Sequence, residues 1–197
     1  MSVRELAHRW PDRRRIVAAG VALVGLALFG EGLYIKAKAS VAQVLLERAW
    51  TETLETGEPV RPWAWFDTWP VARVSVPRLR QSAIVLNSTS GQAMAFGPGL
   101  MTAGPSPGSP GLSIISAHRD THFRFLKDLS VGDEIRVETT DQAVHTFRIF
   151  DLRVVEADQS GLSFEHDDVL LALTTCWPFD GVQSGSKRFV AIARRTA

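Results

Sequence analysis

Three residues in the C-terminal part of the chain have side chains that could act together in acyl transfer: Cys176, His118 and Arg188. A free thiol is only a few per cent thiolate at neutral pH, so a nucleophilic cysteine gains from a neighbouring imidazole or cation. Histidine can supply or accept the proton. The permanent charge of arginine can hold a carbonyl or a developing oxyanion. We therefore predict cysteine-dependent chemistry on these three residues.

Each of the three residues lies where an apolar segment meets a loop. Cys176, the only cysteine, ends a run that begins at Val169, His118 follows the segment 112–117, and Arg188 begins the last apolar segment. A lone thiol cannot form an intramolecular disulfide, so in an exported protein chemistry is a natural role for it. Structural roles stay open as alternatives, the thiol as a buried packing residue and the arginine as a surface cap.

The four other histidines are weaker candidates for the base. His8 precedes an apolar N-terminal segment, His145 falls in an alternating segment, and His166 lies in an acidic turn. His122 is close enough to His118 in the sequence to remain a rival.

Short β-rich segments from residue 71 onward must position these side chains. Turn-forming residues separate them and no long helical pattern intervenes, which favours a mostly β domain, either a closed barrel or a sandwich. Strands are predicted over 71–76, 83–86, 112–117, 134–138, 144–157 with a bend, 169–175 and 188–193, and helical turns over 90–95 and 123–129. The Gly- and Pro-rich segment 97–111 is predicted to be a turn-rich connection, because it lacks the Gly-Lys-Ser/Thr of a phosphate loop.

The N-terminal region has the pattern of a membrane anchor. The apolar segment 16–35 has about the 20 residues needed to span a bilayer, and the arginines before it outweigh Lys36 and Lys38 after it. The positive-inside bias predicts a cytoplasmic N-terminus and an exported remainder. The predicted organisation is a basic cytoplasmic segment over 1–15, a transmembrane signal anchor over 16–35, a juxtamembrane helix and Trp-rich linker over 36–69, and a catalytic domain over 70–197. A signal peptide cleaved after the small-residue segment 37–39 is the alternative.

Composition excludes several other classes of partner. With 22 basic and 21 acidic residues the formal charge is +1, which gives no electrostatic case for nucleic acid. No acidic residues are clustered clearly enough to predict a metal site, so we expect neither a metal nor a cofactor.

The aromatic residues of 61–70 are expected either at the membrane interface or packed on the outside of the β domain.

On these residues the sequence resembles the sortase family of membrane-anchored cysteine transpeptidases. The residues before Cys176 are similar to the family's Thr-Leu-x-Thr-Cys, with Leu173 and Thr175 in register, and His118 lies in a segment similar to the family's Gly-His-Arg. Ala117 stands where glycine is common, a small steric change. The Cys-Trp-Pro-Phe at 176–179 looks closest to the sortases of Gram-negative bacteria. The resemblance implies a closed sortase-like β-barrel with short helices.

The resemblance also implies a reaction and its partners. Cys176 would attack a Thr-Gly bond in a Leu-Pro-x-Thr-Gly-like sorting signal and form a thioacyl-enzyme. His118 would protonate the leaving amine and deprotonate the incoming one, while Arg188 would position the substrate or stabilise the oxyanion. Thr175, Asp120 and Ala117 would support the site. The implied partners are a protein with a C-terminal sorting signal, an amine acceptor, and membrane lipid around the N-terminal helix. The protein would then be a single-pass inner-membrane protein with a periplasmic catalytic domain.

Two other classes stay open. An L,D-transpeptidase would also be exported and use a cysteine, but its Ser-x-Gly-Cys-Arg-like context is missing because Trp177 and Pro178 follow the thiol. A membrane-tethered, non-catalytic β domain that binds a surface protein would keep Cys176 as an inert packing residue.

Overall fold

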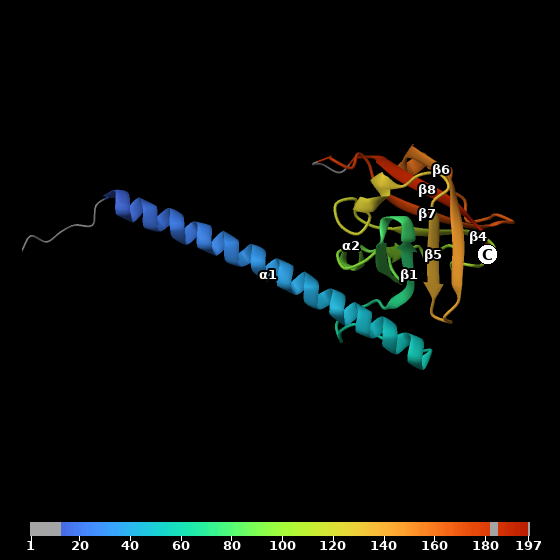
Figure 1. The fold of residues 1–197 in the computed structure, drawn as a ribbon, viewed down its shortest axis with the longest axis horizontal. Coiled ribbons are helices and arrows are strands. Elements are labelled where there is room, and N and C mark those ends of the chain that lie inside the picture. Colours follow the sequence, from blue (N-terminus) through green and yellow to red (C-terminus); the bar gives the residue numbers. More distant parts are fainter. Residues whose placement is uncertain (1–12, 182–184, 197) are drawn as a thin grey trace, which may run out of the picture. The chain divides into compact units, whose positions relative to one another are not determined.

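The computed structural model describes residues 13–181 and 185–196. Residues 1–12, which make up most of the predicted cytoplasmic segment, lie outside this description. A long helix, α1 (Arg13–Thr56), comes first (Figure 1). By length and composition it could cross a membrane, and large side chains in its apolar stretch, such as Leu23 and Phe29, are exposed. The chain divides into two compact units, Met1–Val41 and Ala42–Ala197, so α1 contributes residues to both.

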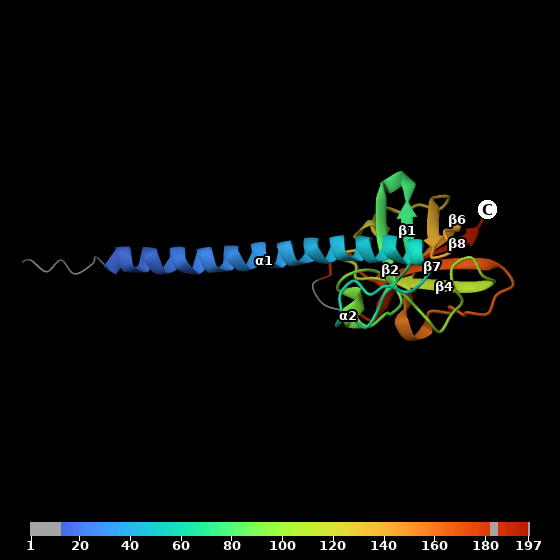
Figure 2. The same cartoon turned by 90° about the horizontal axis from the view of Figure 1, so that it is seen from below.

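The described residues of the second unit contain strands that close into a barrel in the order β1-β2-β3-β4-β7-β8-β6-β5 (Figures 1 and 2). The strands are β1 (Pro70–Val76), β2 (Gln81–Leu86), β3 (Gly99–Leu100), β4 (Gly111–Ser116), β5 (Glu134–Thr139), β6 (Val144–Glu156), β7 (Val169–Cys176) and β8 (Lys187–Arg195). Short helical elements include α2 (Gly91–Met94) and a 3-10 helix (Arg124–Asp128). The prediction of a closed, mostly β barrel with short helices is confirmed.

Most strands follow the predicted segments, and β3 is the exception. It lies inside the segment that the sequence predicted to be a turn-rich connection, because two residues are too few to show an alternating pattern. Gly99 pairs with Ser116 of β4, and a Cβ at position 99 would overlap the backbone of Ser88. Glycine is therefore needed where this short strand passes the segment after β2. The predicted bend in β6 is confirmed, since its register with β8 shifts between Ile149 and Asp151.

The barrel has a core inside and a second apolar cluster on part of its outer face. β1 alternates between buried and half-buried residues, as expected of a strand covered on one face. β4 and β7 are buried almost throughout, because Ile115 and Leu173 face the inner core while Ile114 and Ala172 belong to the outer cluster. These two strands pair in parallel, and burial on both faces is typical of parallel strands. They are also the strands that lead to His118 and Cys176.

The end of α1 and the aromatic linker belong to the second unit and pack on the barrel. Leu46 and Trp50 of α1 are fully buried, and Glu47 of the helix makes an ion pair with Arg73 of β1 at 2.6 Å. In the linker, the rings of Trp63 and Phe66 are tilted against each other with centroids 4.4 Å apart, and both contact Phe96. Of the two expected locations for the aromatic residues, these rings occupy the barrel exterior. Trp65 differs, with 79% of its surface exposed.

Candidate active site at the ends of β4, β7 and β8

The three predicted catalytic residues come from three neighbouring strands. Ser116, the last residue of β4, pairs with Thr174 of β7 in parallel register. His118 and Cys176 each follow two residues later, so both lie at the same end of this strand pair. On the other side of β7, Cys176 pairs directly with Arg188 of antiparallel β8. Adjacent strands are about 4.8 Å apart, so the barrel brings together residues that are distant in the sequence.

Strand alternation gives these side chains a common face. In β7, Ala172 belongs to the outer apolar cluster, and Cys176 lies an even number of residues beyond it. Arg188 likewise lies an even number of residues from Val190, another member of the outer cluster. If the alternation of β4 is continued past its end, His118 falls on the same face as Ile114, which also belongs to the outer cluster. The thiol, the guanidinium and the imidazole thus belong to the outer face of the sheet, where a peptide can approach. His118 is exposed, whereas Cys176 and Arg188 are half-buried.

Hydrogen bonds between the ends of β4 and β7 hold this arrangement. The buried hydroxyl of Thr175 donates to the carbonyl oxygen of Ala117 at 2.7 Å. The hydroxyls of Ser116 and Thr174 are 2.6 Å apart, and the Ala117 N–H donates to the Thr174 carbonyl oxygen at 3.2 Å. Two predicted supporting residues, Thr175 and Ala117, therefore meet directly, one residue before the nucleophile and one before the base.

The guanidinium of Arg188 contacts the backbone of the β7–β8 connection. Its Nη1 donates to the carbonyl oxygens of Gly185 at 2.8 Å and of Lys187 at 2.9 Å. A guanidinium has five N–H donors, so these two bonds leave donor capacity for a substrate carbonyl. Arg188 is therefore equipped both to fix the end of the loop and to bind an oxyanion.

Three aromatic rings pack beside Cys176. Trp177, the residue after Cys176, stacks on Phe189 at 6.2 Å between centroids and meets Phe179 edge-on at 5.5 Å. Phe179 and Phe189 are 5.2 Å apart, and both also pack against the barrel core. This aromatic cluster, Trp177, Phe179 and Phe189, fixes the first residues of the loop after the nucleophile.

The structure separates the two candidate histidines. His122 lies in the turn after His118, which the hydrogen bond from the Phe123 N–H to the His118 carbonyl oxygen closes at 3.1 Å. Burial lowers the pKa of the His122 imidazole, a backbone hydrogen bond with Ala95 opposes this shift, and the nearby His118 lowers the pKa further. His122 is thus half-buried and has a backbone partner at Ala95, whereas His118 is exposed, which favours His118 as the partner of the thiol.

The structure does not bring every predicted residue into the site. Asp120 is exposed, and in the described part of the chain no hydrogen bond or ion pair joins it to His118. The supporting role implied for Asp120 therefore has no contact with His118 behind it. No cluster of three or more His, Cys, Asp or Glu that could hold a metal ion occurs among the described residues.

One contact near the site had no role in the prediction. Arg119, next to His118, is buried, and its guanidinium donates to the carbonyl oxygen of Gly181. The sequence places Arg119 inside the Gly-His-Arg-like segment, but nothing local indicates a partner 62 residues away.

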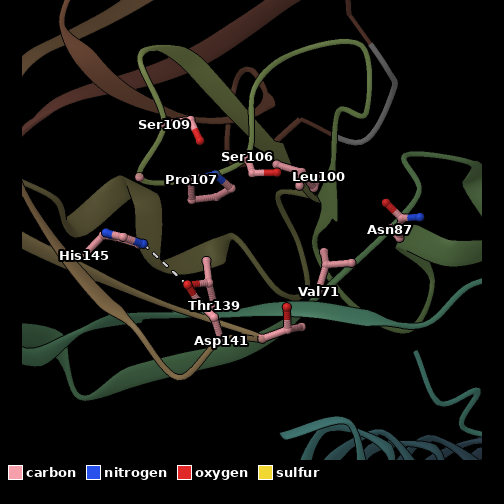
Figure 3. Close-up of a pocket in the computed structure, with 11 residues that line it drawn as sticks. Val71, Asn87, Leu100, Ser106, Pro107, Ser109, Thr139, Asp141 and His145 are labelled. Carbon is pink, nitrogen blue, oxygen red and sulfur yellow. Dashed lines mark hydrogen bonds between the residues drawn. The ribbon is translucent and has the colours of Figure 1, made fainter. Parts of the chain in front are cut away.

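A separate cavity of about 460 Å³ lies at another part of the barrel, lined by Leu100, Thr139, Asp141 and His145 among others (Figure 3). Its polar groups bond to one another, because the Thr139 hydroxyl donates to Asp141 at 2.6 Å and lies 3.4 Å from the Nε2 of His145. Arg195, at the opposite end of β8 from Arg188, donates to Gly108 in the cavity wall. A strand rises about 3.4 Å per residue, so Arg195 and the cavity wall that it contacts lie roughly 24 Å along β8 from Arg188.

The fold and the site together define a β-barrel protein that carries a cysteine, a histidine and an arginine on neighbouring strand ends. The family model described as the sortase domain matches residues 74–196, which is more than half of the chain. The chain therefore belongs to the sortase family.

Individual relatives agree with this assignment. Sortase D of Bacillus subtilis (strain 168) is 27% identical over 123 residues, and the match spans 62% of this chain and 62% of that relative's length. The structure of a sortase D5 transpeptidase from Clostridium perfringens is similar with a TM-score of 0.65 at 19% identity, over 80% of this chain and 99% of that one. Sortase C-1 of Actinomyces oris gives a TM-score of 0.59 at 25% identity, over 65% of this chain and 73% of that one. The Gram-negative subgroup stays a prediction.

Proposed function

We propose that this protein is a membrane-anchored cysteine transpeptidase that cleaves a sorting signal in a target protein and transfers the acyl part to an amine. The observation that supports this best is the direct pairing of Cys176 with Arg188, beside the β4 end that leads to His118. Family membership supports the reaction class. The sorting signal is proposed to be Leu-Pro-x-Thr-Gly-like and the bond cleaved to be Thr-Gly.

In the first half of the reaction, the Cys176 thiol passes its proton to His118 and its sulfur attacks the carbonyl carbon of the scissile bond. The oxyanion that develops is stabilised by Arg188, since its donor-rich guanidinium lies across the strand pair from the thiol. When the C–N bond breaks, His118 gives a proton to the leaving amine. The product of this half is a thioester between the substrate acyl group and Cys176.

In the second half, an amine replaces the leaving group. His118 accepts a proton from the incoming amine, whose nitrogen attacks the thioester carbonyl, and the Cys176 sulfur departs as the new amide forms. Water in place of the amine would hydrolyse the same thioester and release the acid. The half-buried position of Cys176 beside the aromatic cluster favours a reaction with limited access of bulk water.

The proposed setting is the inner membrane. The apolar part of α1 would span the bilayer once, with the arginine-rich N-terminus in the cytoplasm and the barrel on the periplasmic side. Large exposed apolar side chains along this part of α1 support the assignment, because lipid would cover them. The target protein and the acceptor amine would then meet the enzyme outside the cytoplasm.

The test uses the full-length protein in detergent micelles, incubated with a panel of Leu-Pro-x-Thr-Gly-like peptides with and without amine acceptors. Intact-mass spectrometry is expected to detect an acyl adduct on Cys176, which an acceptor amine converts to a new amide product. Cys176→Ala is the matched control and should give neither species while keeping the same thermal unfolding. If no peptide gives an adduct and the thiol is shielded from alkylation until denaturation, the non-catalytic binding domain replaces this proposal.

A further inference from the structure

A buried arginine connects the two loops that carry the predicted base and the nucleophile. Arg119 follows His118 directly, and only 9% of its surface is exposed. Its Nη2 donates to the carbonyl oxygen of Gly181, which lies in the connection from β7 to β8, shortly after Phe179. A single guanidinium therefore spans from the end of β4 to the loop beyond Cys176.

Besides the hydrogen bond, the guanidinium of Arg119 packs closely against the backbone of Gly181. A Cβ at position 181 would lie 3.0 Å from the Nη1 of Arg119 and 3.3 Å from its Cζ. Any side chain at this position would push the guanidinium or the loop away by a few tenths of an ångström. Glycine thus lets the loop backbone pack directly on the face of the guanidinium.

Arg119 and Arg188 hold the same connection at two points. Arg188 bonds to the carbonyl oxygen of Gly185, at the β8 end of the loop, while Arg119 bonds to Gly181 nearer the β7 end. Burial of a guanidinium is costly unless it is hydrogen-bonded, and a bond to a charged donor is stronger than one between neutral groups. Removing Arg119 would therefore remove the attachment at Gly181, while the attachment at Gly185 would still depend on Arg188, the proposed oxyanion donor itself.

We propose that Arg119 is a positioning residue for the reaction: through Gly181 it sets the position of the β7–β8 connection and so the spacing between His118, Cys176 and Arg188. It acts without touching the substrate. This inference rests on the proposed function for its effect on turnover, although its effect on the reactivity of the thiol can be measured without a substrate. Misplacement of catalytic groups by about 1 Å can cost a factor of about 10² in rate.

The test compares Arg119→Ala, Arg119→Lys, Gly181→Ala and the double variant Arg119→Ala/Gly181→Ala, all in the full-length protein. We expect Arg119→Ala to lower kcat by about 10- to 100-fold with little change in KM. Arg119→Lys should recover part of this loss, because an ammonium can still donate to the Gly181 carbonyl. Gly181→Ala should lower kcat as well. The double variant should be little worse than the poorer single variant, since both changes break the same contact.

Arg124→Ala is the matched control. Arg124 is an exposed arginine in the 3-10 helix after His122, and its removal should leave kcat within about twofold, as expected for a surface substitution. Thermal unfolding of every variant is recorded, and kinetics are measured at least 15 °C below the lowest Tm. A loss of kcat that disappears under these conditions would assign Arg119 a purely structural role and overturn the proposal.

Alkylation of Cys176 by iodoacetamide at pH 7 separates this proposal from the proposed function. Arg119→Ala and Gly181→Ala should each slow the reaction several-fold, because the thiol loses its close imidazole and guanidinium neighbours. A wild-type protein that alkylates readily but transfers no peptide would refute transpeptidation alone. Unchanged alkylation in both variants, or additive effects of Arg119→Ala and Gly181→Ala on its rate, would refute the positioning role.

Discussion

Two parts of the same barrel carry histidine, threonine and other polar side chains, and they differ in what those groups contact. Around the ends of β4 and β7, the thiol of Cys176 and the imidazole of His118 make no hydrogen bond to another described side chain. In the cavity near the far end of β8, the hydroxyl of Thr139 lies between Asp141 and His145 and bonds to the carboxylate (Figure 3). The cavity is therefore the region whose polar groups already have partners.

The lowered pKa of Asp141 supports the same distinction between the two regions. The Thr139 hydroxyl and the N–H of Ala143 hydrogen-bond to Asp141 and hold the pKa of this carboxyl below its ordinary value. An acid stabilised in its ionised form is a poor proton donor near neutral pH. Among the described residues no side chain hydrogen-bonds to His118 or Cys176, which leaves both groups available for the proposed proton transfers. The comparison therefore favours the strand ends over this cavity as the proposed reaction site.

The sharpest test of this comparison is the replacement of the predicted base. His118→Asn should lower kcat/KM for transfer by roughly 10²–10⁴-fold, the range expected for loss of a general acid–base group. His122→Asn is the matched control, because burial lowers the pKa of His122 and its backbone partner lies at Ala95. Its pH–rate profile should keep the wild-type shape. Steady-state kinetics of peptide transfer from pH 5 to 9 provide the measurement, and a larger loss in His122→Asn would exchange the two assignments.

Replacement of the arginine opposite the nucleophile should have the next largest effect. Arg188→Ala removes the proposed oxyanion donor and should lower kcat by about 10²–10³-fold. Arg188→Lys keeps the charge but loses the planar set of donors, so it should recover only part of the rate. Single-turnover acylation followed by mass spectrometry isolates the affected step. Equal rates of acylation in Arg188→Ala and in the wild type would exclude a role in the first half of the reaction.

A third prediction concerns stability away from both regions. Asp133 accepts from the Arg78 guanidinium at 2.5 and 2.6 Å and from the Ser130 N–H at 2.8 Å. The hydrogen bond from Arg78 is the main reason that the pKa of Asp133 lies below its ordinary value of 3.8.

Because the pKa is lower in the folded state, the Asp133 interaction contributes its full stability above the unfolded pKa of about 3.9. That contribution is lost as the pH falls through the lower, folded-state pKa. Asp133→Asn should therefore reduce Tm by about 2–4 °C at pH 7 and flatten the dependence of Tm on pH below about pH 4. Thermal unfolding followed by circular dichroism between pH 2 and 7 measures both effects. An unchanged acid slope in the variant would mean that Asp133 has no such role.

The smallest effect is expected in the cavity. His145→Ala removes the imidazole that lies against Gly108, about 24 Å along β8 from the Arg188 end, and should leave kcat/KM for transfer within about twofold. The measurement is the same peptide-transfer assay used for His118→Asn. A loss comparable with that of His118→Asn would show that the two regions are coupled and that the contrast between them is wrong.

Several features follow from local sequence alone. The apolar segment 16–35 indicates a membrane span by its length and composition, and the alternating segments predict seven of the strands within a few residues. Cys176 and His118 stand out because each follows an apolar run. Neighbouring residues decide these properties through hydrophobicity and backbone preference, so they can be read without knowing the fold.

The arrangement of the site required the tertiary structure. The pairing of β4 with β7 joins residues 58 positions apart, as the Thr175–Ala117 hydrogen bond illustrates, and the Arg119–Gly181 contact joins residues 62 positions apart. Neither contact has a local pattern, because a parallel pair depends on which strands share a core and in what register. β3 was missed for the same reason, since its two residues become a strand only through their pairing with β4 and β2. The sequence by itself determined the reactive groups and the elements that carry them, while long-range packing decided which of these groups meet.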